Sequence, residues 1–436
     1  MLASWPAVQP VAGRGRNIPE KHAMEHCEPG DASRRRDLPV YLGLRFLTEA
    51  AALALSVAIG WTVYDVSKSP LSLGIVGIVQ FIPIVLLTLP AGELCDRLSP
   101  RPLVVASLAL QCACALAFLA MTRFPSTGLA ARYGVLLMLG VARALAGPAE
   151  QALLPLLVQP AQLPRAVALG STAWQSAAIL GPALGGLAFA AGAATAYLAS
   201  AVAFLVAMLG AMTLRGRPLP APEGAWGAWG DGVQRVLEGL RFVRGQPVIL
   251  GAMSLDLLAV LVGGATALLP VYAQDILKVG PFGLGMLRSA PAAGACVVGL
   301  VLARHPPERG AGPKLFAAVM AFGAATAIFA LSRSFVVSLA ALAAAGASDM
   351  VSVNIRASLI QLATPDAMRG RVSAVAALFI GTSSELGAFE TGLTAALLGS
   401  VPAVALGGIG TIVAAALWMA VFPGIMKVDR LHPDPG

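Results

Sequence analysis

The chain has 436 residues, of which 57% are hydrophobic and only 12% charged, and its mean hydropathy is +0.79. Soluble domains carry about 25% charged residues, so this composition excludes a soluble globular protein and makes lipid the solvent for much of the chain. The formal net charge of +8 does not predict a nucleic-acid partner, because the basic residues occupy short segments between apolar runs.

Residues 1–38 are polar and carry Arg34, Arg35 and Arg36 just before the first apolar run. They lack the short apolar core and the cleavage site of a secretory signal peptide. We expect a disordered cytoplasmic tail whose arginines fix the orientation of the first span.

Twelve apolar runs follow, each close to the roughly 20 residues that a helix needs to cross a bilayer. Gly and Ala are frequent inside them, which favours close helix packing in lipid. The predicted fold is an all-α membrane protein with twelve transmembrane helices in two six-helix bundles. The predicted spans are 40–64, 71–91, 103–122, 133–157, 166–190, 193–213, 248–273, 282–303, 314–331, 335–361, 372–397 and 402–422.

The segment 215–247 divides these spans into two blocks. It begins Pro-rich and continues with apolar residues at helical spacing between charges, which predicts an amphipathic helix on the inner membrane surface. We expect an N-terminal bundle over 39–214, this linker, a C-terminal bundle over 248–422 and a cytoplasmic tail over 423–436.

The two blocks resemble each other at a nearly constant offset of about half the chain. Gly77 matches Gly285 at an offset of 208, and Gly186 matches Gly392 at an offset of 206. Each match is weak by itself, but the constant offset predicts two related six-helix repeats, an architecture of transporters.

The basic residues predict the orientation of the spans. Of the 30 lysines and arginines, 21 fall in the tails and loops of one side and four inside the spans. The opposite side holds five, namely Lys68, Arg123, Arg132, Lys278 and Arg333. Because cytoplasmic loops are enriched in Lys and Arg, we expect a multi-pass protein of a bacterial inner membrane with both termini in the cytoplasm.

The segment after the second predicted span reads Gly92-Glu93-Leu94-Cys95-Asp96-Arg97-Leu98-Ser99-Pro100-Arg101. It resembles the inner-loop signature of the major facilitator superfamily, although Ser99 replaces the second glycine and Pro100 the first basic residue. The resemblance implies a cytoplasmic gate in which the acid meets a helix N-terminus or a basic side chain; a solvated turn is the alternative. The gate residues would be Gly92, Asp96, Arg97 and Arg101.

Charged residues in the first and fourth spans form the leading candidate site. Arg143, followed by Gly147, resembles the intramembrane arginine motif of the same superfamily. At mid-bilayer an arginine needs a partner or a wet cavity. Glu49 lies at similar depth, so we expect it to face Arg143, with Arg45 as the competing partner. The pair either couples solute movement to protons or serves as a structural ion pair.

The fifth predicted span contains Gly181-Pro182-Ala183-Leu184-Gly185-Gly186. This resembles the core of the superfamily motif associated with antiporters, with Ala177 in place of an upstream glycine. Pro182 is expected to kink the helix, and Gly181, Gly185 and Gly186 to let it flex against the other half. Close packing without any antiport role is the alternative.

The second half carries its own charges inside predicted spans. Each one either holds an ion-pair scaffold or contacts solute or protons, because a lipid-facing position is too costly. Arg288 and Glu390 lie at comparable depth, so we expect them to pair. The candidate residues are Asp256, Arg288, Asp349, Glu385 and Glu390.

The segment Ala363-Thr364-Pro365-Asp366-Ala367-Met368-Arg369-Gly370-Arg371-Val372 resembles the loop before the eleventh span in the enterobactin-exporter-like branch of the superfamily. The resemblance implies a secondary transporter that exports a siderophore or drug-like compound by alternating access, with proton antiport. An uptake symporter of the same fold and a non-transporting membrane sensor or scaffold are the alternatives.

Enzymatic activity is not expected. The four histidines lie outside the predicted spans, and the five cysteines show no metal-binding spacing, so we expect no cofactor and no metal site. The expected partners are a small-molecule substrate, protons and the lipid bilayer, with no nucleic acid, and the expected oligomeric state is a monomer.

Overall fold

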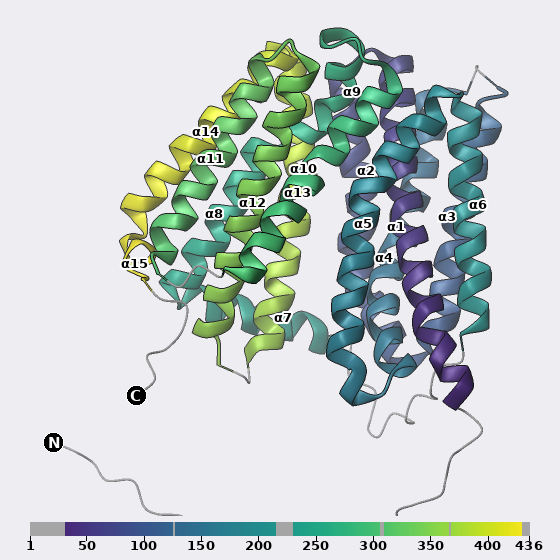
Figure 1. The fold of residues 1–436 in the computed structure, drawn as a ribbon, viewed down its shortest axis with the longest axis horizontal. Coiled ribbons are helices and arrows are strands. Elements are labelled where there is room, and N and C mark those ends of the chain that lie inside the picture. The colour runs from purple at the N-terminus through teal and green to yellow at the C-terminus, as the bar shows by residue number, and fades with distance from the viewer. Residues whose placement is uncertain (1–30, 125–126, 215–229, 306–308, 366–367, 430–436) are drawn as a thin grey trace, which may run out of the picture.

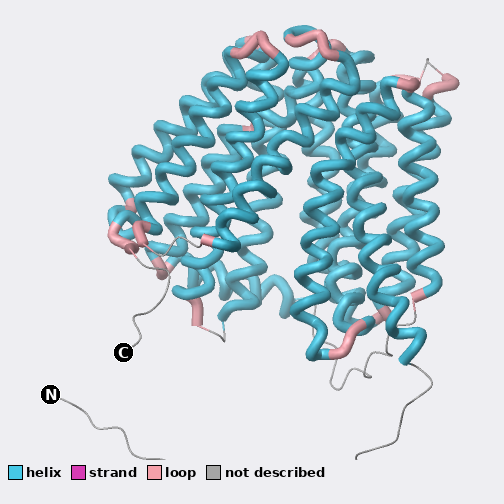
Figure 2. Tube along the Cα trace, viewed as in Figure 1, coloured by secondary structure: helices cyan, strands magenta, loops and turns pink. Residues whose placement is uncertain are grey.

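The computed structural model describes residues 31–124, 127–214, 230–305, 309–365 and 368–429. Within these ranges every regular element is helical (Figures 1 and 2). Residues 1–30 of the N-terminal tail and the first part of the linker, 215–229, lie outside the described residues. Residues 31–38, expected as part of a disordered tail, are instead the start of the first helix.

The first half of the chain folds into six long helices that run back and forth. Proline at the first turn starts α2 and α3, where its missing N–H has no helical partner in any case. The elements are α1 (Asp31–Ser67), α2 (Pro70–Arg97), α3 (Pro100–Met121), α4 (Leu129–Leu157), η1 (Pro160–Gln162), α5 (Leu163–Ala190) and α6 (Ala193–Thr213).

The second half repeats this pattern after a short helix, α7. The elements are α7 (Gly230–Arg244), α8 (Pro247–Gly263), η2 (Ala265–Leu268), α9 (Leu269–Val271), η3 (Tyr272–Ile276), α10 (Gly280–Arg304), α11 (Ala311–Leu331), α12 (Phe335–Ala363), α13 (Arg369–Leu398), α14 (Ser400–Val421) and α15 (Pro423–Met426).

Eleven described helical segments are long and apolar enough to cross a membrane. The fifth predicted span, 166–190, is not among them; it lies within α5, whose Gly, Ser, Thr and Gln residues lower its hydropathy. α5 packs between α1 and α10, so less of its surface needs to face lipid. The all-α fold of two helical groups is confirmed.

Two further boundaries differ from the prediction. The second span was expected to end at residue 91, but α2 continues through Pro90 and Gly92 to Arg97. It ends just before Ser99-Pro100, because the residue that precedes a proline disfavours the helical conformation. The seventh span was expected as one helix over 248–273. Instead α8 ends at Gly263, Gly264 leaves the helical region, and η2, α9 and the π-helix η3 complete the crossing around Pro270.

In the part of the chain that the structure describes, the two helical groups approach each other most closely at one end of the molecule. Figure 1 shows them close together at the end that holds α9, here named the α9 end, and apart at the opposite end, here named the α7 end. One continuous cluster of buried apolar side chains joins both groups at the α9 end; it includes Val63 and Tyr64 of α1 and Tyr272, Leu284 and Phe329 of the second half.

Glycines set the closest contacts between the groups. A Cβ at Gly186 of α5 would lie 2.9 Å from the Cα of Gly285 in α10, and a Cβ at Gly392 of α13 would lie 2.9 Å from the Cα of Gly74 in α2. The two contacts are thus built alike, each with one glycine from each half. Because glycine has no side chain, the backbones can come this close, and small residues are common where helices associate in lipid.

α7 packs beneath the second half. Glu238 pairs with Arg371 at 3.3 Å, and a Cβ at Gly239 would lie 2.7 Å from the Arg371 carbonyl oxygen. The predicted helix of the linker is therefore present, and its place on the membrane surface stays a prediction.

Candidate functional site

A group of polar side chains from both halves meets beyond the glycine contacts between them. A Cβ at Gly140 of α4 would lie 2.6 Å from the Gln80 carbonyl oxygen of α2, so the two helices nearly touch there. One turn further along α4, Arg143 donates a hydrogen bond from its guanidinium to Gln80 Oε1 at 3.4 Å. The tight crossing thus holds Arg143 beside α2.

Glu385 of α13 reaches into the same place from the other half. Its Oε2 would lie 3.0 Å from a Cβ at Gly77 of α2, so the missing side chain makes room for the carboxylate. Arg143 and Arg288 both lie within electrostatic range of Glu385. Because Arg143 is exposed and lies within electrostatic range of a carboxylate of the opposite half, its guanidinium faces the space between the halves.

Arg288 approaches from α10, one turn beyond the glycine contact at Gly285. It donates a hydrogen bond to Ser56 Oγ of α1 at 2.5 Å and lies within electrostatic range of both Glu385 and Arg143. The name inter-bundle cluster is used below for Ser56, Gln80, Arg143, Arg288 and Glu385.

The expected pair of Arg288 with Glu390 is not formed among the described residues. Glu390 accepts a hydrogen bond from Thr394 at 2.7 Å, and Thr391 also donates to it. Equal distance from a helix end did not predict contact. The carboxylate within electrostatic range of Arg288 is that of Glu385, which lies more than one helical turn before Glu390 in α13.

The expected pair of Glu49 with Arg143 is also not formed. Arg45 instead pairs with Glu150 of α4 at 3.3 Å, and Tyr41 donates a hydrogen bond to the Glu150 carbonyl oxygen at 3.1 Å. Glu49 lies within electrostatic range of Glu150 and is half-buried, but it makes no ion pair with any described residue. Arg143 turns away from α1 toward α2, which explains the difference.

The second half has a corresponding buried pair. Arg356 of α12 pairs with Asp256 of α8 at 2.8 Å, both side chains being less than 10% exposed, and it also donates to Ser352 at 3.2 Å. Asp349 lies within electrostatic range of both partners. The acid and the base have exchanged helices relative to Arg45 and Glu150.

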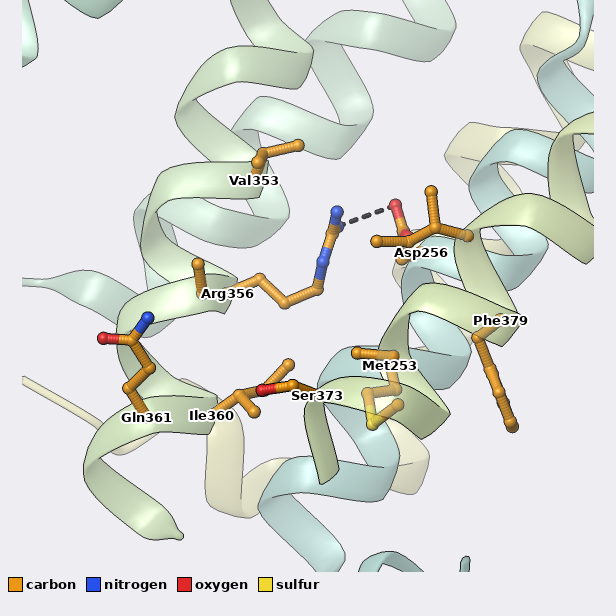
Figure 3. A pocket seen from close by; sticks show the side chains of 11 residues that line it. Met253, Asp256, Val353, Arg356, Ile360, Gln361, Ser373 and Phe379 are labelled. Atoms are coloured by element: carbon orange, nitrogen blue, oxygen red, sulfur yellow. Dashed lines mark ion pairs between the residues drawn. The ribbon is translucent and has the colours of Figure 1, made fainter. Parts of the chain in front are cut away.

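A cavity of about 280 Å³ opens beside this pair between α8, α12 and α13. Figure 3 shows Arg356 and Asp256 joined across it, with Met253 and Phe379 on the α8 and α13 sides. Its lining is mostly apolar, and Gln361 and Ser373 add polar groups near the α7 end.

The gate-like motif is only partly described. Gly92 and Arg97 belong to α2, and nothing lies within 4 Å of a Cβ placed at Gly92. The side chains of Asp96 and Arg97 are outside the described residues. Arg101 donates a hydrogen bond to the Met212 carbonyl oxygen at the end of α6, where a cation also meets the negative end of the helix dipole. A latch across the halves stays a prediction.

The glycines of the α5 motif contact two different helices. Cβ atoms at Gly181 and Gly185 would lie within 3 Å of Ala50 and Ala54 of α1, whereas Gly186 faces α10. Pro182 lies inside α5 without ending it. The motif therefore places α5 tightly between its own half and the other one.

The α9 end is held by polar contacts that the sequence reading did not single out. Tyr64 donates a hydrogen bond to Asp275, Lys68 donates to Gln274 at 3.3 Å, and Gln274 donates to the Trp61 carbonyl oxygen at 3.3 Å. All three link the end of α1 to η3. These residues sit at predicted span ends, where polar side chains are ordinary, so no sequence signal marked them.

Sequence reasoning missed Gln80 and Ser56 as site residues. Glu150 and Arg356 correspond at the same offset of 206 that relates Arg143 to Asp349, which marks them as charges exchanged between the repeats but does not predict their partners. No comparable signal marks Gln80 or Ser56.

Comparisons with known proteins agree on one family. The family described as transmembrane secretion effector matches residues 45–432. The enterobactin exporter EntS of Shigella boydii is 23% identical over 386 residues, covering 88% of this chain and 90% of that protein, and EntS of Escherichia coli is similar to the same extent.

Solved structures show the same fold. The nucleoside transporter NupG superposes with a TM-score of 0.69 at 15% identity, covering 90% of this chain and 100% of that one. A bacterial homologue of the iron transporter ferroportin, in an inward-facing state, superposes with a TM-score of 0.69 at 16% identity, covering 90% of this chain and 99% of that one.

Proposed function

We propose, from the premise that this chain belongs to the major facilitator superfamily and within it to the transmembrane secretion effector family, that it exports a small molecule by alternating access. It is a multi-pass membrane transporter, and its relatives and fold indicate transport rather than catalysis. The similarity to enterobactin exporters makes a siderophore one candidate cargo and a drug-like compound another.

One observation supports this proposal above all others. Glu385 of one half and Arg143 of the other lie within electrostatic range of each other between the two bundles. Charges at this depth are tolerated where they face a partner or a wet passage. A passage that opens alternately on either side of the cluster gives these charges access to water, and each half offers the other a charged partner.

The distribution of basic residues supports the direction of opening. With 21 lysines and arginines in the tails and loops of the side that carries the termini, the α7 end faces the cytoplasm. The halves are close together at the α9 end, so the described arrangement is the inward-facing state (Figure 1).

We assign proton coupling to Glu49. Its carboxyl group is half-buried in α1 and lacks an ion pair with the described residues, while the neighbouring Glu150 already has Arg45 as its cation. A carboxyl group without a fixed cation can take up or release a proton as water or solute enters.

Inverted membrane vesicles test the direction of transport. Cells that overproduce the protein yield vesicles in which an exporter pumps inward, so a panel of siderophores and drug-like compounds is screened for proton-driven accumulation. Accumulation in inverted vesicles supports export. Accumulation in whole cells, without accumulation in the vesicles, would establish an uptake symporter instead.

The Glu49→Gln variant tests coupling in the same vesicles. We expect solute-driven proton movement to be lost while the protein still inserts and runs as a single species by gel filtration. Glu238→Gln, which alters a carboxylate of α7 outside the bundles, is the matched control and keeps coupling. Normal coupling in Glu49→Gln would remove Glu49 from the mechanism.

A further inference from the structure

Four arginines lie deep in the two halves, and they fall into two classes. Arg45 and Arg356 each have a carboxylate at ion-pair distance, 3.3 Å from Glu150 and 2.8 Å from Asp256. Arg143 and Arg288 have no carboxylate within that distance among the described residues. Their hydrogen-bond partners are the neutral side chains of Gln80 and Ser56.

The two unpaired arginines share a single acid. Both lie within electrostatic range of Glu385, and Arg288 also lies within range of Arg143. Two guanidinium groups and one carboxylate leave one positive charge in excess in the inter-bundle cluster. In a membrane protein such an excess is costly unless a counter-charge or water occupies the space beside it.

We propose that Arg143 and Arg288 form a binding site for the carboxylate of an organic anion, with one guanidinium contributed by each half. Glu385 lies within electrostatic range of both arginines when the site is empty, and the incoming carboxylate replaces it as their counter-charge. This inference names the substrate class for the proposed transport function and rests on that function only in treating the occupant as cargo.

Geometry and charge both suit this occupant. A guanidinium presents a planar fork of N–H donors that matches a carboxylate, and charge-assisted hydrogen bonds of this type are stronger than neutral ones. Because the two arginines belong to different halves, an anion between them contacts both at once. The inside-negative membrane potential also drives an anion outward, which is the direction proposed for transport.

The test measures binding of simple probes to the purified full-length protein by equilibrium dialysis. The probes are benzoate and salicylate, with benzamide and salicylamide as neutral compounds of the same shape. We expect the anions to bind and the amides to bind at least tenfold more weakly. Equal binding of anions and amides would overturn the proposal.

Variants identify the residues. Arg143→Gln and Arg288→Gln are each expected to weaken benzoate binding about 10- to 100-fold, the range for a hydrogen bond to a charged group. Glu385→Gln removes the competing carboxylate and is expected to tighten benzoate binding several-fold, a gain that misfolding cannot produce. Arg123→Gln, at the exposed end of α3, is the matched control and leaves binding unchanged. Weaker binding in Glu385→Gln, or undiminished binding in both arginine variants, would contradict the site.

The outcome is distinguishable from the fate of the proposed function. Arginine-dependent benzoate binding without flux of any compound would leave the anion site standing and refute transport. Proton-driven export of neutral compounds only, without selective anion binding, would leave export standing and refute the anion site.

Discussion

At the scale of single residues, the exposure of an ion pair decides what it contributes. The pair of Asp256 and Arg356 is less than 10% exposed and spans two helices, whereas Lys68 and Asp65 pair at 2.8 Å with both side chains about 60% exposed. Removing one partner of a buried pair leaves an uncompensated charge, while an exposed pair is screened by solvent.

We therefore expect Asp256→Ala to lower the stability of the protein by about 3–5 kcal/mol, because Arg356 then stays buried without its carboxylate. The double variant Asp256→Ala/Arg356→Ala is expected to regain part of this loss. Asp65→Ala, the exposed control, should cost about 1 kcal/mol or less. Thermal unfolding in one detergent measures all three; equal losses for Asp256→Ala and Asp65→Ala would contradict this reasoning.

The sequence predicted which residues carry the buried charges better than how they pair. Arg143, Arg288 and Glu385 were all expected inside the spans, and the structure brings them together. The predicted pairs of Glu49 with Arg143 and of Arg288 with Glu390 were wrong. The sequence gives the depth of a residue along its helix. It does not give the helix rotation and crossing angle, which decide which neighbour a side chain meets.

At the scale of helices, glycines determine where the two halves touch. The repeat analysis related Gly77 to Gly285 and Gly186 to Gly392, and these four residues lie at the two places where the halves meet. Sequence thus located the contacts between helices. It did not predict the break in the seventh span at Gly263, Gly264 and Pro270. The apolar run that holds these residues has a glycine content like that of neighbouring runs, which form unbroken helices.

We expect Gly186→Ala to destabilise the protein by about 1–3 kcal/mol, the usual cost of overpacking. The added Cβ would lie 2.6 Å from the Pro281 carbonyl oxygen and 2.9 Å from the Gly285 Cα, and neither backbone atom can move aside cheaply. Differential scanning fluorimetry of the purified protein measures the change.

Gly134→Ala is the matched control for this prediction. Gly134 also lies inside a long helix, α4, but nothing lies within 4 Å of a Cβ placed there. Alanine is preferred over glycine in a helix by about 0.5–1 kcal/mol, so the control should be neutral or stabilising. A loss of stability in the control equal to that of Gly186→Ala would show that the loss at Gly186 does not come from the α5–α10 contact.

At the scale of the whole molecule, the described arrangement is closed at the α9 end by both apolar and polar contacts. The continuous apolar cluster crosses from α1 to η3 and α10, and Tyr64 and Asp275 are hydrogen-bonded at its edge. Alternating access requires that this end open, so these contacts oppose the outward-facing state. Weakening them should shift the population toward it.

Tyr64→Phe removes the hydroxyl that bridges to Asp275 and keeps the ring in the apolar cluster. Loss of about 1 kcal/mol at this contact should raise the outward-open population roughly five-fold.

The reporter is a cysteine at Ala388, which lies against Gly74 and Gly77 of α2, in a background without the native cysteines. An impermeant maleimide applied from the α9 side should label it faster in Tyr64→Phe. Asp65→Asn changes a carboxylate at the same end that pairs only within its own segment, and it should leave the labelling rate unchanged. If Tyr64→Phe labels at the rate of the parent protein, the hydrogen bond between Tyr64 and Asp275 does not govern the opening of the α9 end.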